Sequence, residues 1–396
     1  MGTEILLTTL SLFTFLRPGG SSPVRVLADF IARAQAIADT VERQYAVEEF
    51  LRDALRGGTP LIQDSTVSFI STGPASSVRV ASDLNGWNPQ ADTMKQLRGT
   101  DFRYFSAVVP AAARFEYKFI VDSTWVLDPL NPRRVSGGYG PNSEVWMPSY
   151  RPPADVTVRL RVPRGTLDTI RIRSAILGRT HTVTVYRPPG YAASSAAAPV
   201  LYVLDGGEYL SLGVMNVVLD NLIADRAITP PVCIFLDPRT NPADSRTSMR
   251  MGDYAMSDSF LTSLITEIRP FIMKRYRCSG NPAQTGIMGA SLGGLAAVHA
   301  AFERPEVFGF CAAQSPSFWW DNARLLTRIE NSPSRPFAVY IDTGTIRDAQ
   351  DAARRARDLF AARGYRLHYE EHPEGHNWVN WRARIGSILR FFSGTP

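Results

Sequence analysis

The chain has 396 residues, of which 44% are hydrophobic and 20% charged, so it is long enough for two domains and a sizeable core. This composition excludes a disordered or fibrous protein. The net charge of +6 comes from basic residues scattered singly or in pairs such as Arg133-Arg134. A nucleic-acid-binding protein usually concentrates basic residues in a run or stripe, so nucleic-acid binding is not expected here. A mildly positive field favours anionic substrates.

The first 22 residues hold a candidate export signal. Ile5 to Leu16 is an apolar run of signal-peptide length, but Glu4 precedes it and no Lys or Arg does. Pro18 to Ser22 is either a processing region or a linker. The compartment stays open, with the cytoplasm slightly favoured over secretion or the periplasm. No stretch reaches the roughly 18 to 20 apolar residues of a membrane span, so none is expected.

The cysteines give an odd count without metal-ligand spacing: they are Cys233, Cys278 and Cys311. Two of them fall in apolar, strand-like runs, which predicts buried thiols rather than a disulfide framework. The sequence implies no metal and no organic cofactor. It leaves the oligomeric state open, with a homodimer among the options.

The N-terminal half changes its hydrophobic period once. Residues 26–57 carry apolar side chains at three- and four-residue spacing, which predicts helices after a leader, within a segment 1–61. From Thr66 the period becomes two, and Gly, Pro and Asn turns separate short runs, which predicts an immunoglobulin-like β-sandwich over 62–150. The runs are 67–70, 78–80, 105–109 and 115–121. Pro152-Pro153 then marks a linker.

Residues 166–396 alternate between predicted strands and helices. The strands are 182–186, 200–204, 232–236, 285–288, 309–313, 337–341 and 367–371, and helical segments begin near 213, 257, 292, 321, 348 and 378. This alternation predicts an α/β fold with a mostly parallel sheet and helices on both faces.

Gly289-Ala290-Ser291-Leu292-Gly293 follows a short apolar strand and opens an Ala-rich helix. A strand that turns directly into a helix holds the serine at strained backbone angles with its hydroxyl exposed. The glycines two residues before and after it leave room for the turn and for a substrate. Because this context separates the motif from chance Gly/Ser loops, Ser291 is predicted to be a nucleophile.

A nucleophilic serine needs a base, and in an α/β-hydrolase the base follows it in the chain. His299 lies on the same helix more than two turns past the serine, so packing is expected for it. His368 lies in an alternating, strand-like run. His372 and His376 lie in the loop before the last helix. A glycine beside His376 lets the backbone bend toward the site, so His376 is the preferred base and His372 the reserve.

The acid that orients the base is expected after the preceding strand, which ends at Asp342. Asp348 is the preferred acid, because Asp342 is still within the strand and Asp351 lies inside the next helix. The alternative for Asp348 is a helix N-cap.

Two backbone N–H groups are needed to stabilise a tetrahedral oxyanion. One is expected from Leu292, directly after the nucleophile. The other is expected from the loop after the strand 200–204, where Gly207 is preferred and Gly206 and Glu208 stay open.

Five segments resemble the enterochelin esterase and esterase D group of α/β-hydrolases, a group that also includes feruloyl and acetyl-xylan esterases. They are Leu204 to Gly206, Gly289 to Ala297, Gln314 to Trp320, Gly344 to Asp348 and Gly375 to Trp378. The resemblance covers about residues 166–396, and its Ser-Phe-Trp-Trp run is similar to the siderophore-esterase branch. It implies a Ser291–His376 pair with Asp348 as the acid.

One segment departs from that branch. After Asp237 the branch tends to carry an Arg followed within a few residues by Glu-Leu or Glu-Tyr, whereas Arg246 to Met251 contains no Glu. Arg246 stays a candidate substrate-binding residue. Trp319 and Trp320 either form an aromatic wall for an aryl acyl group or belong to the core.

Residues 62–148 resemble the early-set domains related to the glycogen-binding module. In glycan-binding members two tryptophans stack on sugar faces while a lysine and an asparagine bind hydroxyls, and the matching positions are Trp87, Lys118, Trp125 and Asn142. The alternative is that these residues hold the sandwich together or that the sandwich covers the active site.

The leading hypothesis is therefore a serine carboxylic-ester hydrolase of the enterochelin-esterase type, acting on a siderophore-like ester. A feruloyl or acetyl-xylan esterase that acts on plant polysaccharide is the first alternative. The others are an acyltransferase and a polysaccharide-binding protein with a vestigial hydrolase domain.

Overall fold

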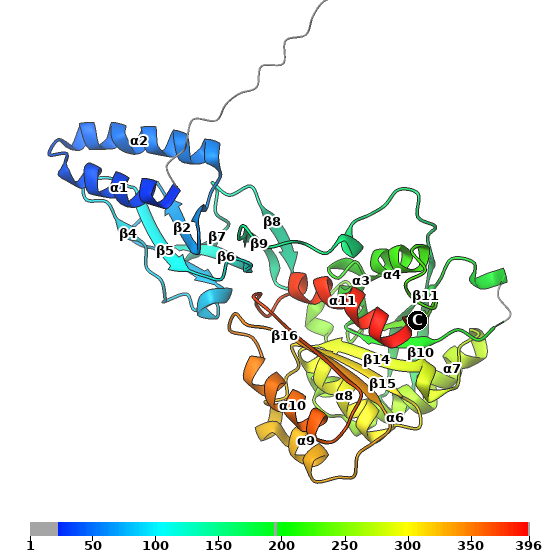
Figure 1. The fold of residues 1–396 in the computed structure, drawn as a ribbon. Coiled ribbons are helices and arrows are strands. Elements are labelled where there is room, and N and C mark those ends of the chain that lie inside the picture. The colour runs from blue at the N-terminus through cyan, green and yellow to red at the C-terminus, as the bar shows by residue number, and fades with distance from the viewer. Residues whose placement is uncertain (1–22, 194–195, 395–396) are drawn as a thin grey trace, which may run out of the picture. The chain divides into compact units, whose positions relative to one another are not determined.

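The computed structural model describes residues 23–193 and 196–394, so the candidate export signal lies outside the described residues. The chain forms two compact units (Figure 1). One holds the residues up to Pro74 together with Lys95–Val109, and the other holds Ala75–Met94 together with Pro110–Pro396. The strands predicted within 62–150 belong to both units, and the sandwich domain over that segment stays a prediction.

Two helices and a four-stranded antiparallel sheet form the first unit. They are α1 (Pro23–Ala36), α2 (Thr40–Gly57) and, in sheet order, β1 (Leu61–Gln63), β2 (Thr66–Ser71), β5 (Arg103–Val108) and β4 (Lys95–Gln96). Asp39 caps α2 by accepting a 2.8 Å hydrogen bond from the Glu42 N–H. The rings of Phe30, Phe50 and Phe102 pack with centroids 4.1 to 5.8 Å apart. Helices α1 and α2 confirm the helices that the hydrophobic spacing predicts within residues 26–57.

An antiparallel sheet opens the second unit. In sheet order it consists of β3 (Val78–Ser82), β6 (Arg114–Val121), β9 (Gly140–Trp146) and β8 (Arg134–Gly137), and β7 (Thr124–Val126) pairs with β6. The side chains of β6 alternate, because successive residues of a strand face opposite ways. Phe115, Tyr117 and Phe119 are buried on one face, and the other face carries Arg114, Glu116 and Lys118. One face of β6 is therefore apolar, and the other carries charged side chains.

An eight-stranded sheet is the centre of the second unit. Its order is β10 (Thr166–Ser174), β11 (Arg179–Arg187), β13 (Val232–Leu236), β12 (Val200–Leu204), β14 (Thr285–Ala290), β15 (Phe310–Gln314), β16 (Ala338–Gly344) and β17 (Leu367–His372). Strands β10 and β11 run antiparallel to their neighbours, and all other pairs are parallel. The predicted mostly parallel sheet is confirmed, and β10 is a strand that the sequence reading did not include.

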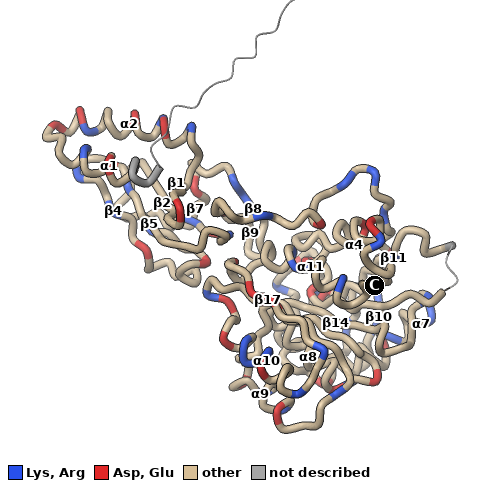
Figure 2. Tube along the Cα trace, viewed as in Figure 1, with Lys and Arg blue, Asp and Glu red and all other residues tan. Residues whose placement is uncertain are grey.

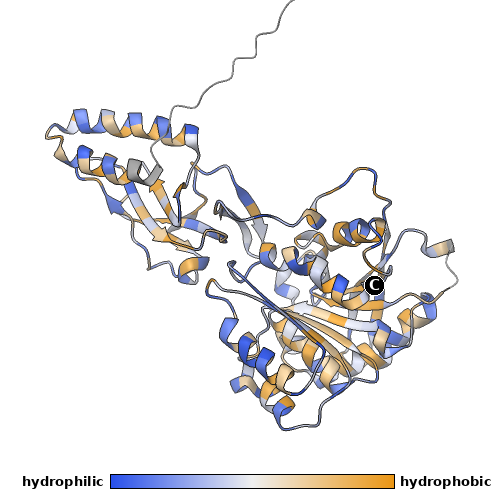
Figure 3. Ribbon diagram, in the orientation of Figure 1, coloured by the Kyte–Doolittle hydropathy of each residue, from blue (hydrophilic) through white to orange (hydrophobic). Residues whose placement is uncertain are grey.

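Helices cover both faces of this sheet (Figure 1). They are α3 (Gly206–Ser211), α4 (Met215–Ala224), α5 (Arg250–Tyr254), α6 (Asp258–Ser263), α7 (Arg269–Arg275), α8 (Leu292–Glu303), α9 (Trp320–Glu330), α10 (Gln350–Ala362) and α11 (Trp378–Ser393). Helices α6 to α10 contribute to one apolar core, and α3, α4 and α11 contribute to the core on the other face. The central strands are correspondingly apolar, whereas α10 is largely hydrophilic (Figure 3).

The carboxyl ends of the six parallel strands meet at one edge of the sheet. The segments that follow β12, β14, β16 and β17 there contain Asp205, Ser291, Asp348 and His376.

Acidic and basic residues are interspersed along the chain rather than gathered in a stripe (Figure 2). No helix in the described part of the chain combines the length and apolar character needed to cross a membrane.

Candidate active site

Ser291 occupies a strained turn between β14 and α8. Its backbone lies at φ 57° and ψ −119°, in a region that favours glycine. A Cβ on Gly289 would lie 2.5 Å from the carbonyl carbon of Gly293, so the motif's glycines are needed for the strand to turn this sharply. The geometry is that of the predicted nucleophile elbow, which presents the serine side chain at the edge of the sheet.

His376 and Asp348 form the acid–base pair that the sequence predicts. The Nδ1 atom of His376 lies 2.6 Å from Oδ1 of Asp348. The other carboxylate oxygen accepts hydrogen bonds from the Ser315 hydroxyl at 2.6 Å and from the Gly344 N–H at 2.5 Å. Burial opposes the charge on Asp348, but these hydrogen bonds and His376 lower its pKa below the ordinary value. An ionised Asp348 therefore holds the imidazole with Nδ1 toward itself, which leaves Nε2 for proton transfer.

The segment after β15 joins the nucleophile to the acid. Gln314 accepts a 2.8 Å hydrogen bond from the Ser291 N–H through its carbonyl oxygen, and the Ser317 N–H donates to the Ser291 carbonyl at 3.0 Å. Between them, Ser315 donates to Asp348. The Ser291 and Ser317 hydroxyls lie 3.3 Å apart. Gln314, at the end of β15, and Ser315 and Ser317, which follow it, thus hold the segments of both Ser291 and Asp348. The sequence singled out this segment through its family resemblance but did not predict these contacts.

The other histidines that follow the serine have different partners. His368 and His372 share one carboxylate, with their Nε2 atoms 2.6 and 2.9 Å from the two oxygens of Glu370. His299 is buried on α8, and burial lowers its pKa to about 4. His299 therefore packs as expected, and His372, the reserve base, contacts Glu370.

The other candidate acids also lie apart from the imidazole. Asp342 is within β16, fully buried, and accepts a 2.9 Å hydrogen bond from the Gln314 side chain. Burial raises its pKa well above the ordinary value. Asp351 lies in the first turn of α10. Asp348 is thus the acid that the fold brings to His376.

The candidate oxyanion hole lies at the ends of β12 and β14. Leu292 is the first residue of α8, as predicted. The Glu208 N–H donates to the Asp205 carbonyl at 3.0 Å, so Gly206 and Gly207 remain as second donors. A Cβ on Gly206 would lie 2.5 Å from the backbone of β13, and one on Gly207 would lie 2.4 Å from the Asp237 carboxylate. Gly206 is therefore required by its close approach to a backbone, whereas a side chain at Gly207 would displace the ends of the Asp237 and Arg239 side chains.

Arg250 links the two ends of this candidate oxyanion hole. Its Nε and Nη2 atoms each donate to the buried Asp205 carboxylate at 2.8 Å, and Nη2 also donates to the Ala290 carbonyl at 2.8 Å. Burial opposes the charge, but Asp205 raises the pKa of Arg250, so the arginine stays ionised. Burial and the Asp205 charge also raise the pKa of Glu208 to about 7. The sequence offered no sign of this pairing.

The candidate substrate-binding residues differ in exposure. Arg246 pairs with Asp244 through two 2.9 Å contacts, and its side chain is 88% exposed. Trp319 is 60% exposed and Trp320 is half-buried, with ring centroids 5.9 Å apart. The tryptophans lie two and three residues after Ser317, whose hydroxyl is 3.3 Å from that of Ser291. The segment after β15 thus carries an exposed indole, that of Trp319.

The four residues of the early-set motif lie in the second unit. The rings of Trp87 and Trp125 stack with centroids 6.4 Å apart and an interplanar angle of 27°. Asn142 donates a 2.6 Å hydrogen bond to Glu116, and Lys118 is half-buried on the same face of β6 as Glu116. The structure therefore gathers an aromatic pair with polar neighbours near β6.

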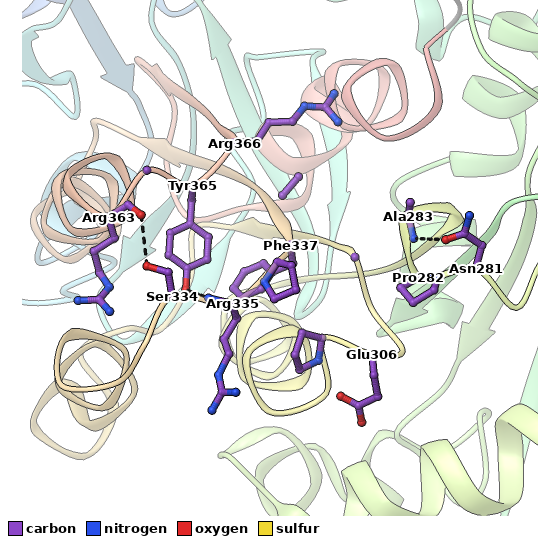
Figure 4. Close-up of a pocket in the computed structure, with 15 residues that line it drawn as sticks. Asn281, Pro282, Ala283, Glu306, Ser334, Arg335, Phe337, Arg363, Tyr365 and Arg366 are labelled. Atoms are coloured by element: carbon purple, nitrogen blue, oxygen red, sulfur yellow. Dashed lines mark hydrogen bonds between the residues drawn. The ribbon is translucent and has the colours of Figure 1, made fainter.

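A surface pocket of about 760 Å³ lies at the opposite edge of the sheet (Figure 4). Its walls come from segments that precede β14, β15, β16 and β17, including Pro282, Gly309, Phe337 and Tyr365. In parallel α/β sheets ligands bind at the carboxyl ends of the strands, so this pocket is not the candidate active site. Within the described residues, His, Cys, Asp and Glu side chains form no group of three or more that could hold a metal ion.

Several known esterases are similar to this chain in sequence or fold. The chain is 23% identical to the iron(III) enterobactin esterase of Dickeya dadantii over 86% of this chain and 92% of that protein. It is 28% identical to the endo-1,4-beta-xylanase/feruloyl esterase of Xylanibacter ruminicola over 38% of this chain and 22% of that protein. The crystal structure of ferric enterobactin esterase from Salmonella typhimurium superimposes with a TM-score of 0.69 at 20% identity, covering 83% of this chain and 93% of that one.

The superposition shows a shared fold that includes the α/β-hydrolase sheet. The family model described as putative esterase matches residues 174–392, more than half of the chain and all of the segments that hold Ser291, Asp348 and His376. This protein is therefore a member of the putative esterase family of α/β-hydrolases and a carboxylic ester hydrolase.

Proposed function

We propose that Ser291, His376 and Asp348 perform ester hydrolysis through an acyl-enzyme. The 2.6 Å contact of His376 with the buried, ionised Asp348, at the same sheet edge as the strained Ser291, carries this assignment. Ser291 Oγ attacks the ester carbonyl while His376 Nε2 takes its proton and then gives it to the leaving alcohol. Water, activated by the same imidazole, resolves the acyl-enzyme.

The oxyanion of each tetrahedral intermediate needs two N–H donors. We assign them to Leu292 and to Gly207, with Gly206 as the alternative to the latter. Arg250 supports this assignment, because it ties the carboxylate of Asp205 to the carbonyl of Ala290 and so fixes the spacing of the two donor segments. Preorganised donors of this kind are usually the largest single contribution to acyl-transfer catalysis.

For the substrate we propose an aryl ester of the siderophore type. The enterobactin esterases among the similar proteins support this class, as does the exposed Trp319 in the segment that follows β15. The xylanase/feruloyl esterase relative supports the alternative of a feruloyl or acetyl-xylan ester. Both substrates place an aromatic or polyol group close to the scissile carbonyl, and the mildly positive net charge of +6 favours an anionic one.

For residues 62–150 we propose an early-set, carbohydrate-binding-module-like domain. The stacked Trp87 and Trp125 rings, with Trp125 45% exposed, support an aromatic surface for a sugar ring. The second reading of this surface is a wall of the active site, because the Trp87 Nε1–H donates at 2.9 Å to Asp83, whose carboxylate contacts the loop of His376.

The proposal predicts that Ser291→Ala abolishes hydrolysis while the protein stays folded. Loss of a serine nucleophile typically lowers kcat by about 10⁴- to 10⁶-fold. The measurement uses p-nitrophenyl esters, methyl ferulate and a ferric catecholate ester, with circular dichroism to confirm folding. A purified variant that keeps more than a few per cent of activity would show that another group is the nucleophile. Product analysis with an excess of alcohol acceptor separates a hydrolase from an acyltransferase.

A further inference from the structure

The short turn Asp83–Gly86 lies against both loops that carry the acid and the base. Asp83 contacts Gly375 and Asn377, the two neighbours of His376. The Leu84 carbonyl accepts a 2.8 Å hydrogen bond from Nε of Arg347, the residue before Asp348. All of these residues belong to the second compact unit. The turn therefore bridges the loops after β16 and β17 from outside the eight-stranded sheet.

The Asp83 carboxylate is built into this position. It is 4% exposed and accepts three hydrogen bonds: Oδ2 from the Asn377 amide at 2.9 Å and the Glu116 N–H at 2.8 Å, and Oδ1 from Trp87 Nε1 at 2.9 Å. A Cβ on Gly375 would lie 2.4 Å from Cγ of Asp83. The backbone of the histidine loop therefore rests directly on the carboxyl group, an approach that only glycine permits.

Arg114 holds the same loop from the other side of Asn377. Its side chain is fully buried, and Nη1 donates to the side-chain oxygen Oδ1 of Asn377 at 3.0 Å and to Glu116 at 2.8 Å. Nη2 donates to Glu144 at 2.6 Å, and the Arg114 backbone N–H donates to the Pro373 carbonyl at 3.0 Å. Buried, charge-assisted hydrogen bonds of this kind are directional and costly to lose.

The side chain of Asn377 is thus held at both ends. Its amide nitrogen is bound by Asp83, and its carbonyl oxygen is bound by Arg114 and also caps α11 through the Asn380 N–H at 3.1 Å. The residue between Gly375 and Asn377 is His376, whose own contact to Asp348 fixes only one ring nitrogen. The backbone on both sides of the imidazole is therefore fixed by residues of the antiparallel sheet and its connecting turn.

We propose that Asp83 and Arg114 are positioning residues that hold the His376 loop in its reactive geometry, so that the antiparallel sheet is a working part of the active site. This inference rests on the proposed role of His376 as the base. A displacement of about 1 Å in a catalytic group can lower the rate by about 100-fold, so loss of this support lowers kcat. Both side chains are buried rather than exposed to a ligand, so we expect substrate binding and KM to change little.

The test compares two variants of the support with a matched control. Asp83→Ala removes the carboxylate, and Asn377→Ser keeps a residue that caps α11 but is too short to reach Asp83 or Arg114. The control is Asp128→Ala. Asp128 is equally buried in the same sheet region and likewise accepts hydrogen bonds from an aromatic side chain, Tyr117 at 2.7 Å, and from a backbone N–H, Leu130 at 2.8 Å.

The kinetic constants are measured for the full-length protein with a small p-nitrophenyl ester, at a temperature where each variant is folded by circular dichroism. We expect kcat to fall by about 10- to 100-fold in Asp83→Ala and Asn377→Ser with KM within about twofold, and Asp128→Ala to lower the melting temperature while keeping kcat. If Asp83→Ala fails to fold, the kcat of Asn377→Ser alone tests the positioning role. Unchanged kcat in Asn377→Ser, or an equal loss in Asp128→Ala, overturns the inference.

A parallel measurement on His376→Ala separates this inference from the assignment of the base. If His376→Ala keeps activity, the base is another residue and the proposed mechanism fails. If His376→Ala is inactive while both support variants keep the wild-type kcat, the mechanism stands and only the positioning role is wrong.

Discussion

The proposed nucleophile and the proposed base of this esterase are held by different parts of the chain. Ser291 is fixed by its own strand and helix, by Gln314 at the end of the next strand and by Ser317 just after that strand. The loop of His376 is fixed by contacts from Arg114 and Asp83, which lie 263 and 294 residues before Asn377 in the sequence. The nucleophile therefore depends on local geometry, whereas the base depends on a distant segment.

This difference determines how substitutions near Ser291 and near His376 affect the site. A change near Ser291 acts through a strained turn whose determinants are neighbouring glycines. A change near His376 acts through buried charges and one asparagine that connects them. We therefore expect substitutions in the antiparallel sheet to affect the His376 loop, although that sheet holds neither proposed reacting group.

The largest expected effect concerns the identity of the base. His376→Ala should lower kcat to within an order of magnitude of Ser291→Ala, because both groups react, and Asp348→Asn should be milder because the acid only orients and stabilises the imidazole. His372→Ala serves as the comparison, since His372 contacts Glu370 instead of Asp348. An inactive His372→Ala beside an active His376→Ala would move the base to His372.

A smaller effect is expected on the nucleophile side. Arg250→Met leaves the buried Asp205 carboxylate without its bidentate partner, which should lower the free energy of unfolding by about 3 kcal/mol and also lower kcat. Arg246→Met breaks a similar bidentate pair on the surface and should leave the unfolding free energy unchanged within error. Urea unfolding of both variants gives the comparison. Equal losses in the two would show that burial does not set the strength of the Arg250 pair.

The smallest expected effect concerns the aromatic pair on the base side. If Trp87 and Trp125 form a glycan surface, the full-length protein should be retained weakly by an α-glucan or a xylan, and Trp125→Ala should abolish that retention. Stacking of a ring on tryptophan contributes about 1 kcal/mol beyond buried area, so a polysaccharide pull-down or calorimetry at high concentration is required. An altered KM for bulky esters without any retention would instead identify the pair as a wall of the active site.

The sequence predicted the parts of the molecule whose determinants are local. Alternating apolar strands and helices specified the mostly parallel sheet, and the elbow glycines identified Ser291 without any knowledge of its neighbours. The Asp348–His376 pair could be chosen because each residue follows a predicted strand in a fixed chain order.

The remaining features depend on contacts that no local pattern encodes. Asp83 has the sequence context of an ordinary turn residue, and its contact with Asn377 arises only in the folded chain. Arg250 lies four residues after Arg246 in a segment without a motif, so the sequence did not predict its pairing with Asp205 either. Strand β10 lies at the edge of the sheet and is partly exposed, so its alternation was not separated from that of the linker.

The backbone of Ser291 has a consequence for protein engineering. A non-glycine residue at φ 57° and ψ −119° raises the energy of the folded state by about 1 to 3 kcal/mol. Glycine relieves that strain and gives back only about 1 kcal/mol through the entropy of the unfolded chain. A library screened solely for heat tolerance would therefore enrich Ser291→Gly, and the most robust clones would include enzymes that no longer cleave anything.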